Sequence, residues 1–133
     1  MSLHPMVRMH IRKWYEKKMD QLHLLPIEEI RAQFNPFSSF KEPEKLYFSD
    51  HAVGQHIKIR LYFPKPISTL REALPIVVYF RASGFFLGAV HHNDKIAALL
   101  AEHTGCCVAA IEPRLSPEVQ YPTPLLEFEE GLL

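Results

Sequence analysis

The side chains best able to do chemistry lie together in residues 81–85, where the sequence reads Arg81-Ala82-Ser83-Gly84-Phe85. Ser83 has a hydroxyl that could act as a nucleophile, and Arg81 has a guanidinium that could bind a carboxylate or a phosphate. The apolar run Leu74–Phe80 comes directly before them, and a helical pattern at Asp94–Thr104 follows. Because function in α/β proteins gathers in loops that follow the carboxyl ends of strands, residues 81–88 are the first candidate site.

Both of these side chains also have a structural interpretation. The sequence puts no acid or base near Ser83, so we favour an ordinary loop serine over a nucleophile. An arginine at the end of a strand is more often solvated than ligand-binding, and we favour a solvated side chain for Arg81.

His91, His92 and Asp94 raise the question of a metal site just after this loop. Adjacent histidines chelate poorly, and the sequence offers no evident third ligand. We therefore expect no metal and no cofactor, and we assign Asn93 or Asp94 to the start of a helix.

Two short apolar runs flank the candidate loop and the helical stretch, Leu74–Phe80 and Cys106–Ile111. Both are too short for helices and lack alternation, which predicts strands that are buried on both faces. Asp94–Thr104 lies between the runs, and Gly105 ends it. The pattern is typical of a βαβ unit with a parallel pair of strands.

An antiparallel hairpin is predicted ahead of this unit, with strands at Lys45–His51 and His56–Phe63 and a turn near Gly54. Apolar and polar residues alternate in the second strand, which indicates one buried face. The residues expected on the buried face are Ile57, Ile59, Leu61 and Phe63, and those expected on the other are His56, Lys58, Arg60 and Tyr62.

The first part of the chain has the pattern of helices followed by a loop. Residues 5–22 carry an apolar stripe that we expect to pack on a core, formed by Val7, Ile11, Trp14, Tyr15, Met19 and Leu22. Binding to a membrane surface is the alternative, since the polar face of this helix is basic. Pro26 predicts a second helix from Ile27 to about Phe34, and residues 35–43 are expected to form an aromatic loop that packs.

Length and composition limit the class of protein. The chain has 133 residues, 15 basic and 15 acidic side chains, and two adjacent cysteines, Cys106 and Cys107. Zero net charge gives no sign of nucleic-acid binding, and adjacent cysteines in one strand imply no disulfide framework. No apolar stretch approaches the ~18 residues of a membrane span. We expect one cytoplasmic domain, with helices and a loop in residues 1–43 and the sheet in residues 44–133.

Two blocks of the sequence resemble hormone-sensitive-lipase-like esterases. Residues 76–88 are similar to that family's V-V-Y-F-H-G-G-G-F-x-x-G, and residues 112–118 are similar to its D-Y-R-L-A-P-E. Residues 121–124 look like the F-P-A-A that follows, with Thr123 capping a final helix and Pro124 as its first residue. The resemblance implies carboxylic-ester chemistry and a truncated α/β-hydrolase fold, with N-terminal cap helices, a β-hairpin and one βαβ unit of a mixed sheet.

The chain departs from this family in the residues that catalysis needs. The family's nucleophile is the serine of a G-x-S-x-G turn, with the acid and the histidine later in the chain, and the sequence contains no G-x-S-x-G. No catalytic residue is therefore assigned. The resemblance makes residues 81–85 a degenerate oxyanion loop that keeps only one of the family's glycines. Ala82 and Ser83 would be strained if their positions need φ > 0.

These departures imply the N-terminal fragment of an esterase that is inactive alone, and the alternative is a non-catalytic binding or assembly module of the same ancestry. Glu112 stands where the family has Asp, and we expect it to hold the proline-rich loop, with Arg114 as a partner. In the family's strand order, 1-2-4-3-5, Ile76–Phe80 would be an open apolar edge. That edge predicts a homo-oligomer or a complementing C-terminal fragment.

Overall fold

The computed structural model describes residues 3–17, 19–33 and 45–133. By its internal contacts the chain divides into two compact units, Met1–Phe34 and Asn35–Leu133. The loop expected at residues 35–43 lies outside the described residues. Across the described part of the chain, no helix has the length and apolar character that crossing a membrane demands.

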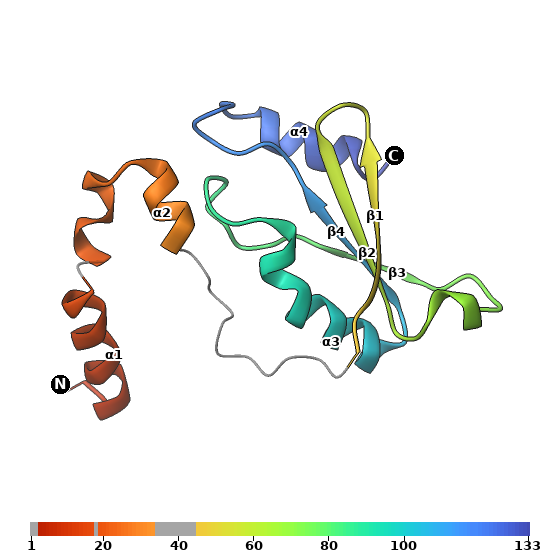
Figure 1. Ribbon diagram of the computed structural model, residues 1–133, viewed down its shortest axis with the longest axis horizontal. Helices are drawn as coiled ribbons and strands as arrows, with labels where there is room; N and C mark the ends of the chain where they lie inside the picture. Colours follow the sequence, from red (N-terminus) through yellow and green to blue (C-terminus); the bar gives the residue numbers. More distant parts are fainter. Residues whose placement is uncertain (1–2, 18, 34–44) are drawn as a thin grey trace. The chain divides into compact units, whose positions relative to one another are not determined.

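The first unit consists of α1 (Pro5–Glu16), the 3₁₀ helix η1 (Met19–Leu24) and α2 (Ile27–Gln33) (Figure 1). Pro5 begins α1, where its missing N–H costs nothing, and Nδ1 of His4 accepts from the N–H of Met6 at 3.3 Å. The single helix predicted over residues 5–22 is wrong beyond Glu16, because Met19–Leu24 form the tighter η1. No described side chain of α1 is buried within this unit, so the packing of its apolar stripe on a core stays a prediction.

The second unit is built on a four-stranded mixed sheet in the order β1-β2-β4-β3 (Figure 1). Its strands are β1 (Tyr47–Val53), β2 (Ile57–Phe63), β3 (Ile76–Tyr79) and β4 (Cys107–Glu112). β2 pairs antiparallel with β1 and with β4, whereas β3 and β4 are parallel. The predicted hairpin and βαβ unit are therefore confirmed, and the left-handed Gly54 (φ 57°) lies in the hairpin turn.

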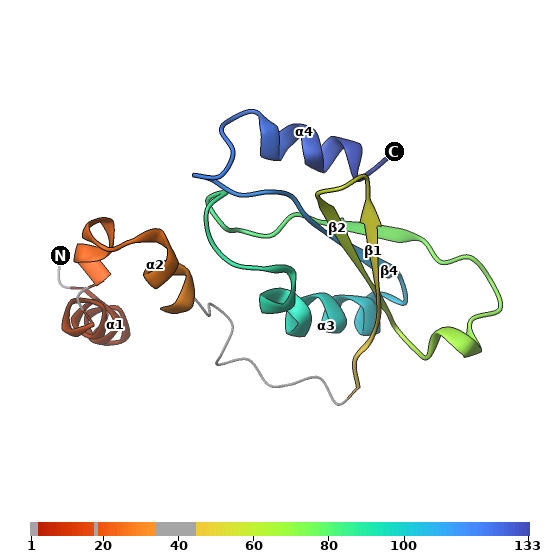
Figure 2. The ribbon, with the colours of Figure 1, turned by 45° about the horizontal axis from the view of Figure 1, so that its top comes forward.

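Two helices cover opposite faces of this sheet, α3 (Asp94–Thr104) and α4 (Thr123–Glu130) (Figure 2). Gly105 ends α3 in the left-handed conformation (φ 71°), as predicted. In α4 the cap position belongs to Pro122, so Thr123 is the first helical residue and not the cap. Two 3₁₀ helices, η2 (Ile67–Thr69) and η3 (Val90–Asn93), precede β3 and α3.

Each face of the sheet has its own apolar cluster. On the α3 side the buried residues are Tyr62, Val90, Ala97, Ala98, Ala101, Val108 and Ala110, and on the α4 side they are Ile57, Ile111 and Phe128. Tyr62 is 0% exposed, so the prediction of a single buried face for β2 is wrong. Because β2 is an inner strand with helices on both sides, its polar face also lies beneath a helix.

β3 and β4 differ in burial although their sequences look alike. β4 is buried from Cys107 to Ile111, as predicted for a strand covered on both faces. β3 is the edge of the described sheet, and there Ile76 is 64% exposed and Phe80, the residue after the strand, is 55% exposed. Burial of β3 on both faces was therefore wrong, whereas its position at an open apolar edge was predicted correctly.

Candidate functional site

The candidate loop, residues 81–88, connects the end of β3 to η3. Its left-handed residues are Gly84 (φ 58°), Phe85 (φ 61°) and Gly88 (φ 77°). Ala82 and Ser83 have no positive φ, so the strain considered for them does not arise. The strain lies instead at Phe85, where a non-glycine residue in this conformation costs about 1–2 kcal/mol.

Ser83 organises the tip of the loop. Its carbonyl oxygen accepts from the N–H groups of Phe86 (3.3 Å) and Leu87 (3.1 Å), and its Oγ accepts from the N–H of Phe85 at 3.2 Å. These contacts give the hydroxyl a structural role in the turn, which agrees with the favoured interpretation of a loop serine.

Three N–H groups stand at the beginning of the tip. Within the described residues, no hydrogen bond is made by the N–H groups of Ala82, Ser83 and Gly84. Ala82 and Gly84 are exposed, and Ser83 is partly exposed. Free N–H groups at the carboxyl end of a strand can bind an anion or a developing oxyanion.

Arg81 is buried, so the predicted solvated side chain is wrong. It is 8% exposed, and its guanidinium donates to the carbonyl oxygens of Leu87 (2.6 Å) and Gly88 (3.2 Å) across the base of the loop. The Nε of Arg81 is buried and has no acceptor in the described residues. Burial lowers the pKa of Arg81, and the negative charge of Glu112 opposes this shift.

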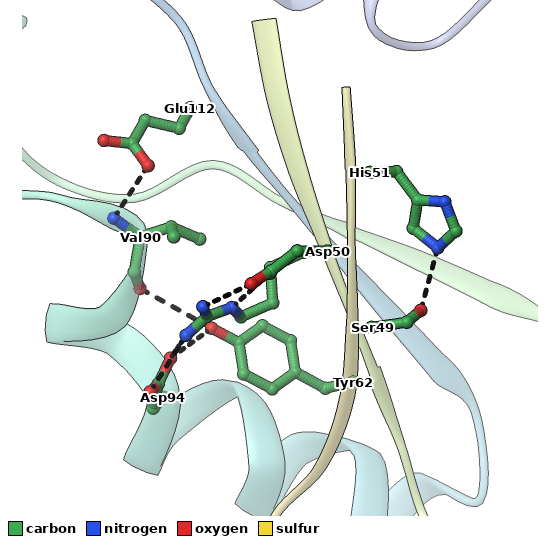
Figure 3. Close-up of polar contacts among 8 residues, drawn as sticks. Ser49, Asp50, His51, Tyr62, Val90, Asp94 and Glu112 are labelled. Carbon is green, nitrogen blue, oxygen red and sulfur yellow. Dashed lines mark hydrogen bonds and ion pairs between the residues drawn. The ribbon is translucent and has the colours of Figure 1, made fainter. Parts of the chain in front are cut away.

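The segment after the loop is held by side chains from three strands. Tyr79 of β3 donates to Oδ1 of Asn93 (3.3 Å), and the hydroxyl of Tyr62 in β2 lies 3.5 Å from the carbonyl oxygen of Val90. Oε2 of Glu112, at the end of β4, accepts from the N–H of Val90 at 3.3 Å (Figure 3). Asn93 thus lies at the cap position of α3, but its side chain bonds Tyr79 and not the helix.

Arg60 joins the hairpin to the start of α3. It donates to both carboxylate oxygens of Asp50 (2.6 and 2.7 Å) and of Asp94 (3.0 and 3.2 Å). The hydroxyl of Tyr62 donates to Oδ1 of Asp94 at 2.6 Å (Figure 3). The hydrogen bond from Arg60 lowers the pKa of Asp50, and burial followed by the bond to Asp94 raises the pKa of Tyr62. The sequence offered one signal for this network, an arginine on the face of β2 opposite its isoleucines.

A second ion pair, between Arg114 and Glu127, holds the proline-rich segment against α4. Glu127 is 5% exposed; its carboxylate accepts from the N–H (2.8 Å), Nε (2.6 Å) and Nη2 (2.5 Å) of Arg114. The expectation that Glu112 holds the proline-rich loop and pairs with Arg114 is wrong, because Glu112 accepts from the N–H of Val90 and Arg114 pairs with Glu127. Sequence reasoning missed Glu127, whose only signal was its position among apolar residues in α4.

The histidines near the loop serve its structure. The rings of His91 and His92 lie 4.3 Å apart, and Nδ1 of His92 accepts from the N–H of Ala89 at 3.0 Å. His91 and Glu112 also border a groove of about 590 Å³ beside the hairpin. Among the described residues, no three His, Cys, Asp or Glu side chains gather closely enough to hold a metal.

His92 should make stability fall as the solution becomes mildly acidic. Burial, with the neighbouring His91 and Arg81, lowers the pKa of His92 below its ordinary 6.5. The unfolded chain therefore takes up this proton first, so the stabilisation is complete above pH 6.5 and is lost as the pH falls below it. In urea unfolding between about pH 7 and about pH 5, His92→Asn should lose less stability than the native chain. The exposed His56→Asn is the control, and equal slopes for all three proteins would contradict the assignment.

Comparison with known proteins points to hydrolases. A sequence model described as the α/β-hydrolase fold matches residues 77–132. An acetyl esterase of Salmonella schwarzengrund (strain CVM19633) is 39% identical over 71 residues, which are 53% of this chain and 20% of that esterase. An acetyl esterase of Salmonella paratyphi B is 38% identical over the same length. The chain therefore spans about a fifth of the length of these curated relatives.

Solved structures give the same fold. A thermostable carboxylesterase cloned from a metagenomic library has a TM-score of 0.67 at 27% identity, covering 82% of this chain and 38% of that one. A hyperthermophilic esterase from the archaeon Pyrobaculum calidifontis has a TM-score of 0.71 at 25% identity, covering 98% and 41%. An arylesterase has a TM-score of 0.76 at 23% identity, covering 99% and 44%, and supports the fold alone. The matched residues, the strand order and these solved structures together show that the chain has the α/β-hydrolase fold.

Proposed function

We propose that this chain supplies the oxyanion-stabilising segment of a hormone-sensitive-lipase-like carboxylic-ester hydrolase, and that it hydrolyses no ester by itself. The observation that carries this proposal lies just after β3, where the N–H groups of the exposed Ala82 and Gly84 and of the partly exposed Ser83 have no hydrogen-bond acceptor among the described residues. The similarity to acetyl esterases supports an ester as the substrate class.

The chemistry follows from what such donors do. When a nucleophile attacks an ester carbonyl, negative charge develops on the carbonyl oxygen, and fixed N–H donors stabilise it. In α/β hydrolases the nucleophilic serine lies in G-x-S-x-G, a motif that this sequence does not contain. The chain thus contributes donors, and in this proposal the attacking group, acid and base are supplied by another segment.

Hydrolysis of p-nitrophenyl acetate tests both parts of the proposal. The purified chain should give the background rate. A chimera in which its matching segment replaces that of the Salmonella acetyl esterase should hydrolyse the ester. In that chimera Gly84→Ala should lower kcat by about 10²–10³, the effect of losing one oxyanion donor. A Cβ at Gly84 would lie 2.9 Å from Phe86 Cε1, so the turn has to shift.

Gly105→Ala is the matched control, because Gly105 also has a positive φ (+71°) but no atom within 4 Å of an added Cβ. Equal kcat for the Gly84→Ala and Gly105→Ala chimeras would show that the loop takes no part in catalysis. Hydrolysis by the chain alone that disappears in Ser83→Ala would instead show that this serine is a nucleophile.

A second candidate function, a non-catalytic assembly module, is supported by the open edge of β3. Ile76 and Phe80 are exposed there, and the strand contains no charged residue or proline that would block pairing with another strand. We infer that a second copy pairs with this edge, and that a complementing C-terminal segment would compete for it.

Light scattering tests the edge. The native chain should be a homo-oligomer, and Val77→Lys in β3 should shift it to monomer because a charge on a paired edge strand opposes association. Leu126→Lys on the exposed surface of α4 is the control and should leave the oligomer intact. A native chain that remains monomeric at about millimolar concentration, far above the dissociation constant of a stable complex, would contradict the inference.

The cysteines support a reducing compartment, and we infer a cytoplasmic location. Cys106 and Cys107 are both free thiols. Burial raises the pKa of Cys107, which makes its thiolate scarce and its oxidation slow.

A further inference from the structure

Two residues at which the chain departs from the esterase motifs act on the same short segment, residues 87–90. Arg81, where the motif has His, donates to the carbonyl oxygens of Leu87 (2.6 Å) and Gly88 (3.2 Å). Glu112, where the motif has Asp, accepts from the N–H of Val90 at 3.3 Å. The two side chains come from the ends of β3 and β4, which are neighbours in the parallel pair.

The charges of the two side chains also depend on each other. Arg81 is buried beside two carbonyl groups and no carboxylate hydrogen-bonds to it in the described residues, so its cation needs a counter-charge nearby. Glu112 is close enough for its charge to favour the charged form of Arg81. Replacing one of the two therefore alters the environment of the other.

We propose that Arg81 and Glu112 are a coupled pair of positioning residues that hold residues 87–90 against the sheet and thereby fix the directions of the Ala82, Ser83 and Gly84 N–H groups. The link to those N–H groups as oxyanion donors rests on the proposed function. The holding of the segment rests only on the contacts of the two side chains.

The order of residues along the loop explains how the hydrogen bonds at its base, from Arg81 to Leu87 and Gly88, direct the residues of its tip. Arg81 begins the loop and bonds the two residues that end it, so the guanidinium closes the loop at its base. The tip between them contains the left-handed pair Gly84 and Phe85, and the carbonyl of Phe85 accepts from the N–H of Ser116 at 2.8 Å. Without the base contacts, this bond and the packing of the Phe85 ring on Phe128 (6.3 Å between ring centroids) would have to orient the tip.

Hydrogen exchange of backbone amides in the full chain tests the pair. In Arg81→Met, the amides of Leu87, Ala89 and Val90 should exchange about ten- to a hundredfold faster, as expected for lost hydrogen bonds to a charged group. The amides of β4, Val108 to Ile111, should keep their rates. Arg81→Lys should give an intermediate increase, because an ammonium keeps the charge but not the planar fork.

Glu112→Gln should accelerate exchange of the same amides. In the variant that combines Arg81→Met with Glu112→Gln, these amides should exchange more slowly than the product of the two single effects predicts. Arg71→Met, at an exposed arginine of the same unit, is the control and should change nothing. Unchanged loop exchange in Arg81→Met and in Arg81→Lys would overturn the proposal. So would an equal acceleration of loop and β4 amides, or single effects that simply multiply.

This experiment separates the positioning role from the proposed function, because exchange needs no ester and no nucleophile. If the esterase chimera is inactive and Arg81→Met accelerates exchange only in the loop, the proposed function is refuted and the positioning role of Arg81 and Glu112 is supported. If the chimera is active and Arg81→Met changes neither loop exchange nor kcat, the proposed function is supported and the positioning role is refuted.

Discussion

Replacing Tyr62 by alanine should lower the free energy of unfolding by about 4 kcal/mol, the usual cost of truncating a buried aromatic ring. Tyr62 has no exposed surface and packs in the cluster beneath α3. Its hydroxyl also donates to Asp94 at 2.6 Å, so the substitution removes a bond to a carboxylate together with the ring. Equilibrium unfolding in urea, followed by far-UV circular dichroism, gives the difference.

Two further variants separate the ring from its hydroxyl. Tyr62→Phe keeps the packing and should cost roughly 1.5 kcal/mol, the value of a hydrogen bond to a charged group. Tyr15→Ala, at an exposed tyrosine of α1, should have no measurable effect. If Tyr62→Ala and Tyr62→Phe cost the same, the ring contributes little and the burial argument is wrong.

Replacing Arg114 by methionine should lower the free energy of unfolding by about 3 kcal/mol. The buried carboxylate of Glu127 in α4 would then keep only one of its donors, the backbone N–H of residue 114. We take the lower end of the range for breaking a buried ion pair, since the Arg114 side chain is 41% exposed and water can partly replace it. The same urea titration measures the loss, and the midpoint should move without a change in slope.

Arg71→Met removes an arginine of similar size from the surface and is the matched control. Glu127→Gln provides a second test, because an amide keeps one oxygen acceptor but cannot form the ion pair. It should fall between the native chain and Arg114→Met. Coincident unfolding curves for Arg114→Met and Arg71→Met would show that the pair contributes nothing.

The elements of the second unit could be predicted because their signals are local. Gly54 and the alternation from Ile57 to Phe63 specify the hairpin within a few residues, and Gly105 specifies the end of α3. The order of the strands needed the resemblance to a family, since hydrophobic pattern alone does not say that β4 lies between β2 and β3.

The side-chain contacts could not be predicted, because each depends on elements far apart in the sequence. Arg81 looked like a solvated strand end, and only the return of the loop at Leu87 and Gly88 gives it acceptors. Glu127 received no prediction, because its partner Arg114 lies in the proline-rich segment and nothing in the sequence of α4 indicates that contact. At Phe85 the local preference fails for another reason, because the turn requires a conformation that its residue type disfavours.

The pairing of β2 with β4 has a consequence for the order in which the chain folds. It brings Lys58 opposite Glu112, so the centre of the sheet forms only when a long loop closes. The β1–β2 hairpin is local and can form in roughly 1–10 μs, but two strands alone are marginally stable in water. During synthesis the hairpin leaves the ribosome well before β4, and until β4 arrives its inner edge can pair with strands of other chains.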